Sequence, residues 1–177
     1  TYGDGRIFDI GKVGLARFAN VAGLQAIGGG HFKDTEKSGP AIVGGAKVST
    51  KLQGLENLVT RVDALILGGG MANTFLLARG QDVGASLVEA DMVDTARAIE
   101  ASAAAHGCVI GLPEDFLVAR EFKQNAPHRV ARPGDVGAGE MILDAGPASA
   151  RAAAEYLAGC KTVVWNGPMG AVEIPPF

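Results

Sequence analysis

Two lysines stand four residues apart, directly after a pair of glycines. They are Lys47 and Lys51, in the segment that follows Gly44 and Gly45. Residues at positions i and i+4 share one face of a helix, so the spacing predicts both ammonium groups side by side at a helix start. Two cations there repel each other and oppose the helix dipole, which a bound anion such as phosphate would relieve. Two solvated surface lysines are the alternative that the spacing leaves open.

Two further polar residues lie near the end of the sequence. Asn166 precedes a Gly-Pro pair and offers a side-chain amide at a turn, while Glu173 could accept hydrogen bonds from hydroxyl groups such as those of a ribose. Such residues also occur simply as turn and surface positions. Glu114 and Asp115 follow an apolar run, where a catalytic carboxylate could lie, but no partner at a defined spacing supports that role.

Glycine is concentrated where apolar runs end. The chain has 26 glycines among 177 residues, roughly twice the average usage. They gather at residues 28–30, 44–45, 68–70 and 167–170. Glycine at such positions lets a phosphate or a flat ring approach the backbone, and the following helix offers N–H groups to an anion. Because the sequence has neither a P-loop motif nor GxGxxG after its first strand, turns that serve packing alone are an open alternative.

The elements that would position these residues alternate between strands and helices. Apolar runs without polar alternation predict strands buried on both faces, at residues 24–27, 41–43, 64–67, 108–112 and 162–165. Apolar spacing near 3.6 predicts helices over residues 48–59 and 90–103, and an Ala-rich composition with interspersed Arg and Glu predicts one over 148–158. We therefore expect an α/β fold, a three-layer Rossmann-like domain with a mainly parallel sheet and ligands beyond the carboxyl ends of its strands. Residues 114–139 predict loops or short antiparallel strands.

Charge and composition argue against several classes of protein. A formal net charge of −3 argues against nucleic acid as the main partner, and no apolar stretch reaches the ~18–20 residues needed to span a bilayer. Two cysteines are too few for a disulfide framework. We expect a cytoplasmic, monomeric globular protein with neither a membrane nor a nucleic-acid partner.

Three longer motifs resemble the phosphoglycerate kinase family. They are AIVGGAKVS at residues 41–49, GGGMANTF at 68–75 and VWNGPMG at 164–170, and DVG at 82–84 and MILDAGP at 141–147 also fit the pattern. The resemblance covers residues 41–177 and falls in the C-terminal, nucleotide-binding domain of the family. It implies a Rossmann-like domain that binds ADP or ATP with Mg²⁺ and serves reversible phosphoryl transfer from 1,3-bisphosphoglycerate to MgADP in glycolysis.

The resemblance also implies roles for single residues. An adenine pocket would be lined by Gly45, Ala46, Gly69, Gly70, Leu143 and Pro168. Glu173 would hold the ribose, and Lys47, Lys51 and Asn166 would contact the phosphates. Lys51 would follow the moving phosphoryl group and is the catalytic candidate.

One domain of the family has no counterpart in this sequence. The resemblance implies that 3-phosphoglycerate or 1,3-bisphosphoglycerate binds to a basic patch on a second domain. Because phosphoryl transfer depends on positioning and charge neutralisation from both sides, we expect this chain alone to bind nucleotide without turnover. A nucleotide-binding α/β module without catalytic activity is the competing interpretation. A dinucleotide-dependent oxidoreductase is disfavoured because GxGxxG is absent.

Residues 1–40 differ from what precedes the GGAKVS motif in the family. Phe8–Asp9, Gly11–Lys12 and Gly28–Gly30 are instead similar to the stretch that follows the IPPF sequence there. We hypothesise that residues 1–40 are the displaced C-terminal part of the nucleotide-binding domain, with strand 24–27 beside the strand ending at Trp165. His31 replaces the family's Asp after the triple glycine, and a neutral imidazole is a poor Mg²⁺ ligand, so no metal ligand is assigned.

Overall fold

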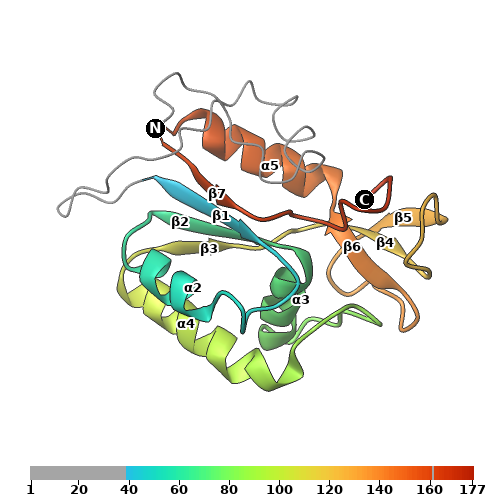
Figure 1. The fold of residues 1–177 in the computed structure, drawn as a ribbon, viewed down its shortest axis with the longest axis horizontal. Helices are drawn as coiled ribbons and strands as arrows, with labels where there is room; N and C mark the ends of the chain where they lie inside the picture. The colour runs from blue at the N-terminus through green and yellow to red at the C-terminus, as the bar shows by residue number, and fades with distance from the viewer. Residues whose placement is uncertain (1–38, 161) are drawn as a thin grey trace.

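The structure is a computed structural model that describes residues 39–160 and 162–177 (Figure 1). Within that range no helix is long and apolar enough to cross a membrane. The strand predicted at residues 24–27, the glycine loop with His31 and the hypothesis on the origin of the first forty residues rest on residues outside it.

Four strands form a parallel sheet, and each coincides with an apolar run of the sequence. They are β1 (Pro40–Gly44), β2 (Ala64–Gly68), β3 (Val109–Gly111) and β7 (Val164–Asn166), in the spatial order β3-β2-β1-β7. Ala41 of β1 is in register with Leu65 of β2 on one side and with Val164 of β7 on the other. Because β1 is buried along its whole length, its sequence is apolar throughout rather than alternating.

Helices cover both faces of this sheet (Figure 1). On one face lie α2 (Leu52–Val59), α3 (Gly69–Ala78) and α4 (Val93–Ala105), the last preceded by the 3-10 turn η1 (Ala90–Met92). Their side chains share an apolar cluster with the sheet that includes Leu55, Phe75, Ile99 and Leu65. On the other face, α5 (Pro147–Ala158) places Leu157 in a second cluster with Ile42. The predicted three-layer α/β fold with a parallel sheet is confirmed.

The start of α2 differs from the prediction. The helix begins at Leu52 rather than at Val48, so Lys47 lies in the preceding loop and Lys51 is the N-cap residue. Val48 is fully buried, and the Thr50 hydroxyl donates to the Lys47 carbonyl at 2.9 Å, which closes a turn ahead of the helix. The expectation that both lysines project from one helical face is therefore wrong.

Residues 114–139 contain short antiparallel strands, one of the two arrangements expected for them. β4 (Phe116–Ala119) lies between β5 (His128–Ala131) and β6 (Met141–Ala145) in a second, three-stranded sheet. The register of β4 with β6 shifts between Leu117 and Val118, where a bulge interrupts the ladder. This interruption and the short strands explain why the sequence shows no clear alternation in this region.

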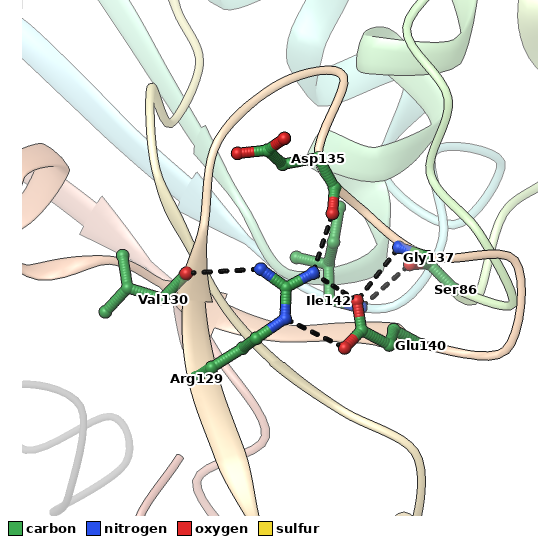
Figure 2. A network of polar contacts seen from close by, with 7 residues as sticks. All are labelled: Ser86, Arg129, Val130, Asp135, Gly137, Glu140 and Ile142. Atoms are coloured by element: carbon green, nitrogen blue, oxygen red, sulfur yellow. Dashed lines mark hydrogen bonds and ion pairs between the residues drawn. The ribbon is translucent and has the colours of Figure 1, made fainter.

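An ion pair stabilises the second sheet near the turn between β5 and β6 (Figure 2). Arg129 donates through Nε and Nη2 to both carboxylate oxygens of Glu140, at 3.0 and 2.6 Å. Glu140 also accepts from the backbone N–H of Gly137 at 2.9 Å. The hydrogen bonds from Arg129 and Gly137 lower the pKa of Glu140 to about 2. Beside this network, the Ser86 hydroxyl accepts from the N–H of Ile142 at 2.8 Å, which ties the segment after α3 to β6 (Figure 2).

Asp115 connects the start of β4 to α5. Its carboxylate accepts from the backbone N–H groups of Ala148 and Ser149 at 2.9 and 2.7 Å and from the Ser149 hydroxyl at 2.5 Å. Desolvation opposes ionisation of Asp115, but these hydrogen bonds together lower its pKa below the ordinary value. The carboxylate caps the N-terminus of α5, so a structural role accounts for this residue.

Candidate functional site

Three loops meet at the carboxyl edge of the parallel sheet. They follow β1, β2 and β7, which are neighbours in the sheet and run in the same direction. The N–H of Met71 donates to the carbonyl of Gly45 at 2.9 Å, and the N–H of Gly69 donates to the carbonyl of Met169 at 2.8 Å. The motifs singled out in the sequence are therefore joined backbone to backbone.

Most glycines of these loops are explained by that close packing. A Cβ atom on Gly44 would overlap the carbonyl of Pro168, and one on Gly70 would lie 2.7 Å from the carbonyl of Ala46. Gly69 has a φ of +67° and also faces a backbone carbonyl, at 2.7 Å from its would-be Cβ. The glycines thus allow the loops to approach one another, which is the packing interpretation that the sequence left open.

The N-terminus of α3 is largely occupied by protein carbonyl groups. Of its first three backbone N–H groups, those of Gly69 and Met71 already donate to the neighbouring loops. An anion at the start of α3 would therefore depend on other donors, in contrast to the expectation that this helix offers its free N–H groups.

Lys51 and Asn166 are brought together, as the resemblance implied. The Lys51 ammonium donates to the carbonyl of Gly44 at 2.7 Å and to Oδ1 of Asn166 at 2.5 Å. Desolvation by the surrounding loops lowers the pKa of Lys51. Across residues 39–160 and 162–177, no carboxylate forms an ion pair with it. A partly buried ammonium whose protein partners are neutral can hold an additional anionic ligand.

An open hollow lies beside Lys51. It has a volume of about 1130 Å³ and is lined by residues 49–58 and by Asn166, among others. The first turn of α2 borders this hollow and has no side-chain cap hydrogen bond from Lys51. The positive end of the helix and the lysine ammonium therefore border the same space.

Lys47 is exposed in the loop between β1 and α2. It lies near Glu89, a residue that the sequence did not indicate: desolvation opposes ionisation of this carboxyl, but hydrogen bonds from Ser49 and, to a smaller extent, the charge of Lys47 lower its pKa. Glu89 accepts hydrogen bonds from the backbone N–H and the hydroxyl of Ser49, at 3.0 and 2.5 Å. Forty residues separate the two partners, so no local spacing could have revealed the contact.

The remaining predicted residues follow β6 and β7. The N–H of Ala171 donates to the carbonyl of Leu143 at 2.8 Å, so residues after Pro168 run beside β6. The Leu143 side chain lies inside an apolar cluster with Phe177, and Glu173 is exposed.

Leu87 is a second residue that the sequence did not indicate. It is 55% exposed, and its Cδ2 would lie 3.1 Å from a Cβ on Gly70. Its exposure beside a glycine loop is the kind of apolar surface that a flat ring could cover.

No group of three or more His, Cys, Asp or Glu side chains in the described part of the chain is arranged to hold a metal ion. His31, which stands where the family has Asp after the triple glycine, lies outside that part of the chain.

Known proteins resemble this chain along most of its length. A sequence model of the family described as phosphoglycerate kinase matches residues 23–177. The phosphoglycerate kinase of Rhodospirillum centenum is 56% identical over 156 residues, which are 88% of this chain and 39% of that protein. The phosphoglycerate kinase of Sphingopyxis alaskensis is 60% identical over 137 residues, 77% of this chain and 34% of that protein.

Solved structures agree with the sequence comparison. Phosphoglycerate kinase from Coxiella burnetii matches with a TM-score of 0.78 and 42% identity, over 81% of this chain and 38% of that one. Phosphoglycerate kinase from Pyrococcus horikoshii matches with a TM-score of 0.68 and 27% identity, over 82% of this chain and 38% of that one. This chain thus spans less than two fifths of the length of these relatives. It belongs to the phosphoglycerate kinase family.

Proposed function

We propose that residues 41–177 are the nucleotide-binding half of a phosphoglycerate kinase and bind ADP or ATP at the carboxyl edge of the parallel sheet. The observation that carries the proposal is the Lys51 ammonium, held between Gly44 and Asn166 without a carboxylate partner among the described residues. A nucleoside diphosphate supplies the missing negative charge.

The three joined loops supply the rest of the nucleotide site. Gly45, Ala46, Gly69, Gly70, Leu143 and Pro168 form the adenine wall in this proposal, with Leu87 as an added apolar contact. Glu173 holds the ribose hydroxyls, while Lys47, Lys51 and Asn166 contact the phosphates. Mg²⁺ binds together with the nucleotide, because it prefers phosphate oxygens and retained waters to an all-protein site.

The reaction is reversible transfer of the acyl phosphate of 1,3-bisphosphoglycerate to MgADP, which yields 3-phosphoglycerate and ATP. Lys51 is the residue that follows the transferring phosphoryl group. The second substrate binds on a domain outside the described residues, consistent with the 34–39% of its relatives that this chain spans. Because both sides must neutralise the phosphoryl charge, the 177-residue chain alone binds nucleotide and does not turn over.

The test combines a binding titration with an ATP-forming assay on the 177-residue chain. Trp165 is the only tryptophan and directly precedes Asn166, so we expect its fluorescence to respond to a ligand at the site without a label. Saturable binding of ADP supports the proposed site, and no response to ADP by fluorescence or calorimetry overturns it. ATP formation from 1,3-bisphosphoglycerate by the isolated chain would contradict the assignment of the second substrate to another domain.

The competing function is a nucleotide-binding module without catalysis. Adding the missing half distinguishes it from the proposed half of a phosphoglycerate kinase. If the chain replaces residues of equal extent in a full-length phosphoglycerate kinase and the hybrid forms ATP, the chain retains its catalytic groups. A folded hybrid that binds ADP and forms no ATP favours the module.

A further inference from the structure

We propose that Glu89 is a positioning residue for the nucleotide phosphates, which it serves by holding the lysine-bearing part of the loop between β1 and α2 through Ser49. The inference rests on the proposed nucleotide site and adds a residue to it that touches no substrate. It is carried by the two hydrogen bonds from Ser49 to the Glu89 carboxylate, at 3.0 and 2.5 Å.

Glu89 is itself fixed by a buried polar pair on α3. Its backbone N–H donates to the hydroxyl of Thr74 at 3.0 Å, and the Asn73 amide donates to the carbonyl of Leu87 at 3.3 Å. Asn73 and Thr74 are only 2% and 0% exposed. Buried polar side chains need partners, and here those partners are the backbone groups that carry Leu87 and Glu89. The segment around Glu89 is therefore anchored to a core helix.

The loop between β1 and α2 has Val48 buried in the core, and hydrogen bonds from other segments hold it in two further places. Its first part, at Gly45, accepts a hydrogen bond from the N–H of Met71 and so rests on α3. Its second part is held at Ser49 by Glu89. Lys47 lies between these two points. Loss of the Glu89 contact should therefore loosen the segment from Lys47 to Ser49, although Val48 stays in the core, and leave the adenine side of the loop in place.

The direction of the change in ADP affinity distinguishes a positioning role of Glu89 from a purely electrostatic role. Glu89 carries a negative charge near Lys47, one of the residues assigned to the phosphates in the proposed site. If charge alone acted, neutralising Glu89 would strengthen ADP binding. If Glu89 positions the loop, the same change weakens ADP binding, because a smaller fraction of the loops is in the binding-competent conformation.

The test measures binding of ADP and of adenosine to the 177-residue chain, by Trp165 fluorescence and calorimetry. Glu89→Gln should weaken ADP binding about tenfold, which corresponds to a fall of the binding-competent fraction to about a tenth. The affinity for adenosine should stay within about twofold of that of the parent. Ser49→Ala removes one of the two hydrogen bonds without a charge change and should weaken ADP about threefold. The matched control is Glu155→Gln, at an exposed position of α5, which should change neither affinity.

A double-mutant cycle adds a measurement, the coupling between Glu89 and Lys47 in ADP binding, that general destabilisation of the fold would not change. In a Lys47→Ala background, Glu89→Gln should lose most of its effect, because the group that it positions is gone. ADP binding by Glu89→Gln that equals or exceeds that of the parent overturns the inference, as does an equal loss for adenosine. Should Glu89→Gln fail to fold by circular dichroism, the Ser49→Ala result decides in the same way. Absence of ADP binding by the parent chain would instead overturn the nucleotide site itself.

Discussion

Replacement of Lys51 by methionine is the most direct test of the proposed phosphate contact. The change removes the ammonium charge and keeps a flexible side chain of similar length. The ammonium has three donor hydrogens, and its two short hydrogen bonds go to Gly44 at 2.7 Å and to Asn166 at 2.5 Å. The third donor makes only a longer contact, to the backbone carbonyl of Asn166 at 3.4 Å, which a phosphate oxygen can replace. A hydrogen bond involving a charged group contributes about 1.5–3 kcal/mol, which corresponds to a loss of about 10- to 150-fold in ADP affinity.

The same change has a smaller effect on stability. Lys51→Met leaves the carbonyl of Gly44 without this donor, which costs about 1–2 kcal/mol. It also removes a cation whose pKa is lowered by desolvation, so part of that cost is offset. We therefore expect a net loss of about 1 kcal/mol in the free energy of unfolding, measured by urea denaturation.

The assay compares ADP with adenosine, which lacks the phosphates. Lys51→Met should reduce affinity for ADP and leave affinity for adenosine within about twofold. Lys123→Met is the matched control, since Lys123 is exposed and pairs with Glu121 in the loop after β4. An unchanged ADP affinity in a folded Lys51→Met variant, or equal losses for ADP and adenosine, would refute the phosphate role.

Three further predictions concern the framework of the site. Gly44→Ala should lower the free energy of unfolding by about 2–3 kcal/mol in urea denaturation, because its Cβ would overlap the Pro168 carbonyl, whereas Gly54→Ala in open space on α2 should be neutral or stabilising. Equal effects of the two would contradict the loop-packing argument. Asp115→Ala should cost about 2–3 kcal/mol by losing the cap of α5, and exposed Asp94→Ala much less. Glu140 has a folded pKa of about 2 against an ordinary 4.5, so its contribution is complete above pH 4.5 and declines as pH falls toward 2. The stability difference between the parent and Glu140→Gln should therefore narrow between about pH 6 and about pH 3, and a constant difference would show that the Arg129 pair is not responsible.

The parallel sheet could be predicted from sequence because its strands are buried on both faces. Runs such as Ala64–Leu67 contain no polar residue, and this feature needs no knowledge of the neighbouring strands. The second sheet could not be resolved in the same way. In β5 three of four residues are exposed, and the bulge in β4 breaks its alternation, so loops and short strands gave equally good accounts.

The candidate site was predictable only in its local parts. Lys51 was singled out by its spacing from Lys47 after a glycine pair, and Asn166 because it stands next to a glycine turn at the end of an apolar run. The predicted start of α2 was wrong because residues far away in the sequence hold the loop before the helix. Val48 enters the core and Ser49 bonds to Glu89, forty residues away, and these tertiary contacts outweigh the helical spacing of the lysines.

The loop glycines and Lys51 support a nucleotide site to different degrees. Gly44 and Gly70 face backbone carbonyls of neighbouring loops, so their lack of a side chain is explained without any ligand. They would be required even in a domain that binds nothing, and they do not by themselves support a nucleotide. Lys51 is different, because packing does not explain a partly buried cation whose partners among the described residues are neutral, and whose desolvation is unfavourable unless an anion is present. The glycines make the three loops meet, and the meeting of the loops places this cation where a phosphate can reach it.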